Sequence, residues 1–346
     1  RTYFISSLVI LYICKLLLIP FLLTDDVFRL FRWVWAKWFD RTAADVAVNI
    51  SRIKFFSQSG AILSGILGLT FIRGMIGNPY NYQLRKVKIK LPNLPDAFNG
   101  LRIVQISDIH TGSFTAKHPI QKGIDLVNEQ NADVIFFTGD LVNYRSDEAI
   151  PYIDMFKQVK AKLGVFSILG NHDYGDYRQW KTDDEKKANM TLLENIHQQL
   201  GWKLLRNKHV MLGEGENQIA VLGIDNWGSS LRFPKYGKMN EAYAGTENAK
   251  VKLLMSHDPS HWDAEVSQQY KDVDVTFSGH THGMQFGIEI PGWIKWSPVR
   301  LVYPHWAGLY QQGKQYLYVN RGFGFLGYPG RVGIMPEVTL IELVKV

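Results

Sequence analysis

Two long apolar runs open the chain. Tyr3–Leu23 is almost unbroken by polar residues and is long enough, at ~1.5 Å of rise per residue, to cross a hydrocarbon core of ~30 Å as a helix. Phe55–Ile76 is a second apolar run, with small residues four positions apart, a spacing that lets helices approach closely in lipid. A buried helix of a soluble protein is the alternative for the first run, but its scarcity of polar groups favours a membrane span. We therefore predict a membrane-anchoring region over residues 1–80, with spans at 3–23 and 55–76.

A third pattern lies between these two runs. In Val27–Phe39, apolar and aromatic residues recur at helical spacing, and Arg29, Arg32 and Lys37 fall between them. A helix with aromatic rings on one face and basic residues on the other is typical of the membrane interface. An ordinary amphipathic helix packed on a domain is the alternative. We predict an interfacial helix over residues 27–39.

Residues 81–100 have the pattern of a strand followed by a loop. Lys86, Lys88 and Lys90 alternate with apolar residues, which predicts an edge strand with one basic face. The following ten residues are rich in Pro, Asn and Gly, the composition of a connecting loop. We assign 81–100 as a linker and edge strand.

From residue 101 the pattern becomes that of an α/β domain. In its first half, strands predicted at Leu101–Ile106, Asp133–Thr138 and Gly164–Leu169 alternate with helices predicted at Ile120–Asn128 and Ala149–Lys162. This order implies parallel strands with right-handed crossovers. A helix at Ala188–Leu200 follows, and the second half is richer in strands: Lys203–Leu205, Val210–Leu212, Ile219–Ile224, Val251–Met255, Val273–Phe277, Met284–Ile290, Gln315–Asn320 and Val338–Val344. We expect two sheets packed together with helices outside, over residues 101–346.

After five of these strands, side chains of the types that ligate metals begin within three residues of the strand end. The residues are Asp108 and His110, then Asp140, then Asn171 with His172 and Asp173, then His257, and finally His280 and His282. Side chains at i and i+2 of an extended chain point the same way, so each spaced pair can aim at one point. The carboxyl ends of strands are where α/β sheets place their active sites.

The donor set suits two divalent cations acting on a phosphate ester. Two cations roughly 3.5–4 Å apart can activate a hydroxide and offset charge on the transferring phosphoryl group. Such a pair needs a bridging carboxylate and mixed oxygen and nitrogen ligands, and this sequence supplies both kinds. His172 could give a proton to the leaving oxygen, with Asp173 orienting it and favouring its charged form. Imidazole and carboxylate ligands suit Mn, Zn or Fe.

These five blocks resemble, in order, the motifs of the calcineurin-like metallophosphoesterase family. The resemblance covers about residues 101–344 and implies a double-sheet αββα sandwich with two metal ions. It implies that Asp108, His110 and His282 hold the first ion and that Asn171, His257 and His280 hold the second. It further implies that Asp140 bridges the two ions, and that His172 serves the leaving group or transition state.

A closer resemblance is to membrane-anchored or exported bacterial phosphodiesterases, among them enzymes that split UDP-diacylglucosamine. It rests on Gly283-Met284-Gln285, on Tyr318-Val319-Asn320-Arg321-Gly322, and on Ser51–Phe56, which is similar to a twin-arginine export signal without its second arginine. This resemblance implies a lipid-linked substrate.

Three further side chains are candidates for contacts with substrate phosphate: Asn143, Arg145 and Arg321. Exposed polar or basic surface is the alternative for each. The aromatic-rich segment Ile290–Tyr310 has two interpretations. Its rings either pack in the core and loops, or form an apolar rim that admits acyl chains or touches the membrane.

The distribution of charge separates the two parts of the chain. The first 90 residues carry 13 Lys and Arg against 4 Asp and Glu, and the remaining residues carry 26 against 28. A nuclease would concentrate basic residues around its active site, so no nucleic-acid partner is expected. Anionic membrane lipids suit the basic part. Basic residues between the two spans favour that loop inside the cell and the catalytic domain outside.

Together, these patterns predict a bacterial cell-membrane enzyme, a metal-dependent phosphodiesterase with two divalent ions. We expect it to hydrolyse phosphodiester or pyrophosphate bonds, in a lipid-linked substrate, by attack of a metal-activated hydroxide. The alternatives are a phosphodiesterase of soluble nucleotides and a non-catalytic metal-binding scaffold.

Overall fold

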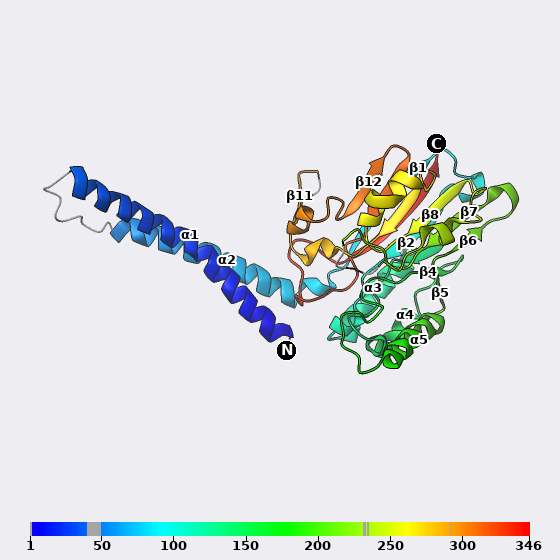
Figure 1. The fold of residues 1–346 in the computed structure, drawn as a ribbon, viewed down its shortest axis with the longest axis horizontal. Helices are drawn as coiled ribbons and strands as arrows, with labels where there is room; N and C mark the ends of the chain where they lie inside the picture. Colours follow the sequence, from blue (N-terminus) through cyan, green and yellow to red (C-terminus); the bar gives the residue numbers. More distant parts are fainter. Residues whose placement is uncertain (1, 40–49, 231–232, 234, 291) are drawn as a thin grey trace. The chain divides into compact units, whose positions relative to one another are not determined.

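The computed structural model describes residues 2–39, 50–230, 233, 235–290 and 292–346. The chain divides into two compact units, Arg1–Gly77 with Gly327–Gly330, and Asn78–Leu326 with Arg331–Val346. Each unit is described by itself (Figure 1).

The first unit is a pair of long helices, α1 (Thr2–Phe39) and α2 (Ile50–Ile76). Both contain a stretch long and apolar enough to cross a membrane, Thr2–Trp38 and Lys54–Ile76. The predicted span 3–23 and the predicted interfacial helix 27–39 lie in one continuous helix, because α1 runs through Pro20 to Phe39 without a break. Thr24 Oγ1 donates to the Pro20 carbonyl at 2.7 Å. Residues 27–39 are the end of this helix, and their place at a membrane interface stays a prediction.

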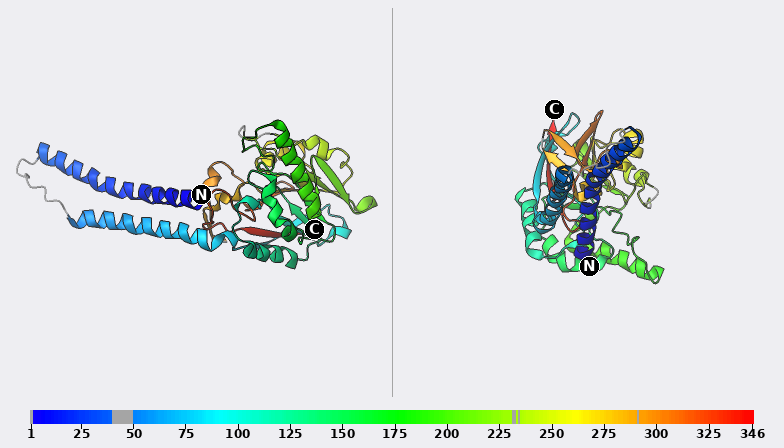
Figure 2. Two further views of the ribbon diagram at one scale, coloured as in Figure 1. Left: turned by 90° about the horizontal axis from the view of Figure 1, so that it is seen from below. Right: turned by 90° about the vertical axis from the view of Figure 1, so that its left-hand side faces the viewer.

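Small residues bring α1 and α2 together as antiparallel neighbours, side by side in both views of Figure 2. Ser64 Oγ donates to the Cys14 carbonyl at 3.0 Å, and Gly68 packs on the Cys14 sulfur. Gly60 faces Leu18 and Phe21, so a side chain there would push the helices apart. The spacing of small residues in the second apolar run therefore marks a helix–helix contact.

The second unit contains two six-stranded sheets. The first has the order β1 (Gln83–Leu91), β14 (Glu337–Lys345), β2 (Arg102–Ile106), β3 (Val134–Phe137), β4 (Val165–Ser167) and β5 (Trp202–Leu204). The second has the order β12 (Gly308–Gln312), β13 (Gln315–Val319), β9 (Val275–Ser278), β8 (Val251–Met255), β7 (Ile219–Gly223) and β6 (Lys208–Leu212). A separate hairpin pairs β10 (Ile288–Ile290) with β11 (Ile294–Trp296). β1 is an edge strand, as its alternating lysines predict, and it lies parallel to β14.

Parallel pairing brings the ligand-bearing strand ends to common edges. β2, β3, β4 and β5 are parallel neighbours in the first sheet. β7, β8, β9 and β13 are parallel neighbours in the second. Gln105 of β2 joins the sheets, because its side-chain amide donates to the Ser278 carbonyl of β9 at 2.9 Å and to Thr138 Oγ1 at 3.1 Å.

Helices cover the outer faces of the sandwich, which confirms the predicted two-sheet α/β fold. On the first sheet these are α3 (Lys117–Glu129), α4 (Ile153–Phe156) and α5 (Asp183–Leu200). On the second they are α6 (Met239–Tyr243), a π-turn over Trp262–Val266 and α7 (Ser267–Gln269). Short 3₁₀ segments lie at Asn78–Tyr80, Asp96–Phe98, Thr111–Ser113, Ser146–Tyr152, Gly215–Asn217, His282–Gln285 and Pro298–Leu301.

Two predicted elements differ from the structure. The helix predicted at Ala149–Lys162 is reduced to α4 after a 3₁₀ stretch that contains Pro151, which supplies no N–H for a regular helix. The strand predicted at Met284–Ile290 begins only at Ile288, because the chain turns through positive φ at Met284 and Gln285.

The apolar layer between the sheets centres on Phe136, which is fully buried. Its ring meets Phe277 of the opposite sheet edge-on at 5.0 Å and Phe166 of the neighbouring strand at 6.4 Å. We expect Phe136→Ala to lower the free energy of unfolding by about 3–5 kcal/mol, because a large cavity would open between the sheets. Denaturant unfolding of the full chain in detergent measures this loss. Phe136→Leu should cost clearly less, and an equal effect of both would contradict the packing assigned here.

Candidate metal centre

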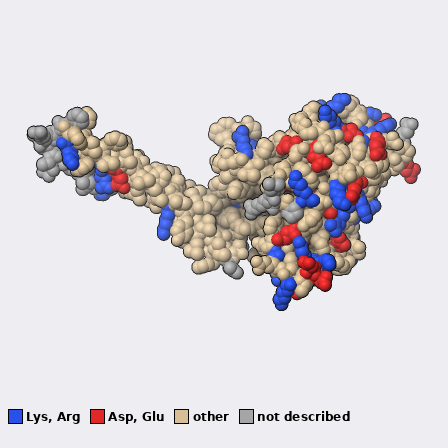
Figure 3. Space-filling model, viewed as in Figure 1, with Lys and Arg blue, Asp and Glu red and all other residues tan. Residues whose placement is uncertain are grey.

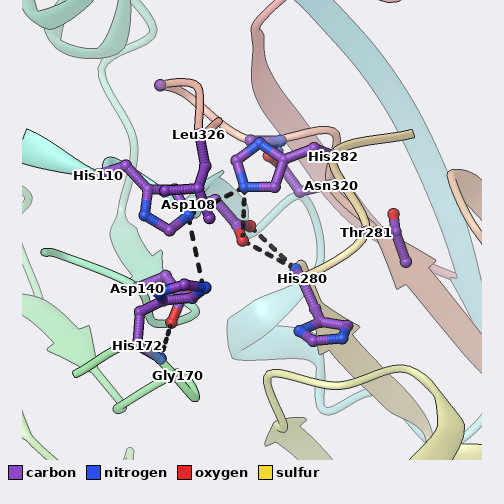
Figure 4. A network of polar contacts seen from close by, with 12 residues as sticks. Asp108, His110, Asp140, Gly170, His172, His280, Thr281, His282, Asn320 and Leu326 are labelled. Carbon is purple, nitrogen blue, oxygen red and sulfur yellow. Dashed lines mark hydrogen bonds and ion pairs between the residues drawn. The ribbon is translucent and has the colours of Figure 1, made fainter. Parts of the chain in front are cut away.

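The first ligand group forms where the loops after β2 and β9 meet. Asp108 and His110 follow β2, and His282 follows β9. His282 Nε2 lies 3.3 Å from Asp108 Oδ1 and 3.0 Å from His110 Nε2. Figure 4 shows these three side chains pointing toward one another. Two ring nitrogens and a carboxylate, all buried, could hold one metal ion.

The second group comes from three loops and centres on Asn171. Its Oδ1 lies 2.7 Å from His280 Nδ1 and 3.2 Å from His257 Nε2. His257 follows β8, so the second sheet supplies both imidazoles of this group. One oxygen and two nitrogens could hold a second ion.

Asp140 lies between the two groups. Its Oδ2 is 3.5 Å from His110 Nε2 and 3.2 Å from His257 Nε2, so one oxygen faces an imidazole of each group. Its other oxygen accepts the His172 backbone N–H at 2.8 Å. Asp140 thus faces both groups, and its predicted role as a bridge between two ions stays a prediction.

The backbone is left-handed at five of the seven candidate ligands. φ is positive at Asp108, His110, Asp140, His280 and His282. Non-glycine residues adopt this region at a cost of the order of 1 kcal/mol each, and such strain clusters at functional sites. Gly170 and Gly279 allow the close approach that results, because a Cβ at either would collide with a ligand aspartate.

Hydrogen bonds fix which ring nitrogen faces the centre in three of the four candidate ligand histidines. His257 Nδ1 donates to the Thr138 carbonyl at 2.7 Å, which leaves the Nε2 lone pair for an ion. His110 Nδ1 lies 3.1 Å from Asn143 Oδ1, with the same result. His280 is turned the other way: its Nε2 lies 2.8 Å from the Tyr303 hydroxyl, so Nδ1 faces Asn171. Outer partners of this kind orient metal-ligating histidines, so the residues present fit a divalent metal centre.

The electrostatics of the cluster also suit added positive charge. Burial lowers the pKa of His257, but the neighbouring Asp140 carboxylate outweighs it and raises this pKa to about 10. Burial lowers the pKa of His110 to about 3. Burial opposes the charge of Asp108 and Asp140, yet the adjacent imidazoles hold both pKa values below the ordinary value. A proton on His257 and a cation would therefore compete for the same lone pair.

His172 stands beside the ligands and lines the cavity above them. Its Nδ1 donates to the Asn143 carbonyl at 2.8 Å, and no other described residue bonds its Nε2. The cavity has a volume of about 440 Å³. Its lining consists of His110, Asp140, Tyr144, Asn171, His172, Tyr177, Phe233, His280, His282 and Leu326.

The expectation that Asp173 orients the His172 ring is wrong. Asp173 is fully buried, and its carboxylate accepts four backbone N–H groups within 2.8–3.3 Å, those of Asp140, Leu141, Val142 and Gly170. Burial, together with the charge of Asp140, raises its pKa to about 7. Asp173 thus holds the turn after β3 against the turn after β4, and the Asn143 carbonyl orients His172 instead.

The three candidates for phosphate contacts have other partners in the structure. Arg321 is 4% exposed and pairs with Glu337 at 2.5 Å and Glu289 at 2.6 Å, so it is a structural cation. Asn143 positions His110 and His172 through its side chain and its carbonyl, respectively. Arg145 pairs with Asp147 on the surface and is not among the residues that line the cavity.

Sequence reasoning missed three residues behind the ligands. Tyr303 contacts His280, and Tyr303 in turn donates to Asp258 Oδ2 at 3.3 Å. Arg331 is fully buried, with Nη2 3.3 Å from His282 Nδ1. Asp258 directly follows the candidate ligand His257 in the sequence, so its position next to that histidine could have marked it. The other two lie 20 or more residues from the ligand that they contact, so no local pattern marks them.

Family models match both parts of the chain. A model described as calcineurin-like phosphoesterase matches residues 101–284, more than half of the 346 residues. The chain belongs to the calcineurin-like phosphoesterase family. A second model, described as the transmembrane domain of a probable calcineurin-like phosphoesterase, matches residues 1–78 and includes Ser51–Phe56. The protein is therefore a metallophosphoesterase of a membrane-anchored branch, and the similarity of Ser51–Phe56 to an export signal stays a prediction.

Relatives occur in animals and bacteria. The chain is 29% identical over 299 residues to a transmembrane protein with metallophosphoesterase domain from Danio rerio, covering 82% of this chain and 64% of the relative. It is 28% identical over 305 residues to the uncharacterized metallophosphoesterase YkuE of Bacillus subtilis, covering 85% of this chain and 98% of that relative. The chain thus spans just under two thirds of the fish relative. Among solved structures, the NAD nucleotidase NadN of Haemophilus influenzae is similar at 13% identity and a TM-score of 0.42, covering 65% of this chain and 45% of that one.

The role of Asp173 predicts the effect of its replacement. In Asp173→Asn one carboxylate oxygen becomes an NH₂ group that faces backbone donors, so we expect a loss of about 1–3 kcal/mol of stability and weaker metal binding. Thermal unfolding and competition with a chelator measure the two effects. Asp176→Asn is the control, since Asp176 is a nearby carboxylate that accepts from the side chains of Lys186 and Tyr236. A variant with unchanged stability and metal affinity, and a changed pH profile alone, would restore the catalytic interpretation.

Proposed function

We propose that this protein is a membrane-anchored phosphoesterase that uses two divalent cations to hydrolyse phosphodiester or pyrophosphate bonds in lipid-linked substrates. The observation that carries the proposal is the convergence of two ligand groups on Asp140, with His172 beside them on the wall of one cavity. Asp108, His110 and His282 would hold one cation, and Asn171, His257 and His280 the other. Bound cations supply Lewis acidity, which offsets phosphoryl charge and makes water more acidic.

The protein's own contribution to the reaction is made by His172. Because its Nδ1–H is held by the Asn143 carbonyl, Nε2 is the ring atom that can give a proton to the leaving oxygen. The backbone N–H of His172 is bonded to Asp140 Oδ1, so the ring is fixed relative to the ligand cluster. The Tyr177 ring packs on the imidazole, with centroids 4.5 Å apart.

The lining of the cavity supports the class of substrate. Its floor consists of the ligands, and Tyr144, Tyr177, Phe233 and Leu326 add apolar surface above them. Polar groups at the reacting centre and apolar walls suit a phosphoester with an apolar portion. The membrane region keeps the enzyme where lipid-linked esters lie. The aromatic rings could also stack on a base, which leaves a soluble nucleotide as the alternative.

The side of the membrane follows from charge. Arg29, Arg32, Lys37 and Lys54 lie at the ends of α1 and α2 that face the connecting segment, whereas Arg41 and the side chain of Arg52 lie outside the described residues. An excess of basic residues near these helix ends favours the cytoplasm for that segment, and thus an extracytoplasmic catalytic domain. A bacterial origin remains part of the proposal.

Hydrolysis of bis-p-nitrophenyl phosphate by the full chain tests the proposal. Stripping the metal should abolish turnover, and Mn or Zn should restore it. Asp140→Asn should remove activity with either metal. His172→Ala should keep its metal and lose about 10²–10⁴-fold in kcat for a diester with a poor leaving group. The loss should be smaller for p-nitrophenolate, which leaves without needing a proton.

His118→Ala is the matched control, because His118 is exposed on α3. The activity of this variant should equal that of the wild type. Absence of turnover with every metal, in protein shown to be folded, would favour the non-catalytic scaffold. Equal losses for good and poor leaving groups in His172→Ala would contradict its role as the acid.

A further inference from the structure

The hairpin of β10 and β11 and the turn after it expose large apolar side chains. Trp293 is 77% exposed, Leu301 90% and Val302 74%, and Ile288, Ile290 and Trp296 are also exposed. We call these six residues the hairpin surface. Soluble domains seldom gather so many exposed apolar side chains within fifteen residues, so this surface needs a partner.

The hairpin is firmly built, so its exposure is not that of a loose loop. Glu289 on β10 pairs with Arg85 on β1 at 2.9 Å and with the buried Arg321 at 2.6 Å. Ser297 Oγ donates to the Gly283 carbonyl at 2.8 Å. Trp306, which follows the hairpin, points inward, since it is 2% exposed and packs on Ile334. The segment thus divides between a packed side and an exposed apolar side.

The charges beside the hairpin surface are positive. Between residues 286 and 302 the charged residues are Glu289, Lys295 and Arg300. Glu289 is neutralised by its two arginines, which leaves the two basic residues. In Figure 3 the surface over β11 is mostly tan with blue atoms. Tryptophan and aliphatic side chains flanked by Lys and Arg are the composition of a membrane-interface surface.

The connection between α2 and the hairpin is short. Helix α2 ends at Ile76, and Arg85, which holds the hairpin through Glu289, follows nine residues later. At ~3.3–3.6 Å per residue, these residues span at most about 30 Å. A connection of this length allows the domain to turn the hairpin toward the bilayer that holds α2.

We propose that the hairpin surface inserts into the headgroup region of the bilayer that holds α1 and α2. The occupant is lipid, because the surface is apolar with a basic border and belongs to a chain with a transmembrane region. An amphipathic surface of this kind buries its apolar residues ~5–10 Å into the interface.

The docked segment is bonded to the loop that carries two ligands. Thr281 Oγ1, which points away from the cluster in Figure 4, donates to the Trp306 carbonyl at 2.6 Å. The Tyr303 hydroxyl contacts His280 Nε2 at 2.8 Å. Contact with lipid would thus orient the catalytic domain through the ligand loop itself. Docking of the hairpin surface on lipid does not depend on the proposed function. If the proposed function holds as well, the cavity would receive its substrate from the lipid phase.

Fluorescent labels on the full chain in vesicles test the docking. In a Cys14→Ala background, Trp293→Cys, Leu301→Cys and, as the control, Leu163→Cys would each carry an environment-sensitive NBD group. Leu163 is 44% exposed in the turn before β4, at the strand end opposite the ligands. Vesicles would contain phosphatidylcholine and phosphatidylglycerol, with or without nitroxide-labelled lipid.

We expect labels at 293 and 301 to emit at shorter wavelength than the label at 163, and nitroxide lipid to quench them at least about twofold more. Emission equal to that at 163 would overturn the proposal. A shift to shorter wavelength without quenching by nitroxide would show a protein, such as a second copy of the chain, on this surface and would overturn it as well. The readout needs no turnover, so its failure is distinguishable from failure of the proposed function.

Discussion

The arrangement of the metal centre depends on a carboxylate that is not itself among the ligands. The Asp173 carboxylate accepts hydrogen bonds from four backbone N–H groups in the turns after β3 and β4. Those turns carry Asp140 and Asn171 and must reverse sharply, with Asp140 in the left-handed region. Each such residue costs of the order of 1 kcal/mol, which hydrogen bonds of similar size can offset. Asp173 therefore stabilises the conformation that lets Asp140 face both ligand groups.

The two sheets supply the rest of the geometry. Parallel neighbours in each sheet bring their carboxyl ends to one edge, and face-to-face packing sets the two edges against each other. His257 and His280 reach Asn171 across this junction, and Gln105 ties β2 to β9 at the same level. A ligand set drawn from five separate loops thus follows from a sandwich of ordinary strands.

The sequence contains most of the fold and the ligand cluster, because both depend on local patterns. Apolar strands of five or six residues followed by Asp or His are visible without a structure. Partners distant in sequence are not visible in local patterns. The sequence therefore offers Arg321 as a candidate for a phosphate contact, although Glu337 and Glu289 neutralise it in the structure. The same limit applies to Asp173, whose neighbour in sequence is His172 but whose partners are backbone amides. In the segment 290–310, composition could not separate the exposed Trp293 from the buried Trp306.

The central claim of the proposed function is that Asp140 would join two ligand groups into one dinuclear centre. Electron paramagnetic resonance of the full chain reconstituted with Mn²⁺ tests it most directly, together with metal analysis of the same sample. The account predicts two Mn²⁺ per chain with a spin-coupled spectrum, and loss of the coupling in Asp140→Asn. A single, uncoupled Mn²⁺ per chain whose binding survives both His257→Ala and Asp140→Asn would contradict it.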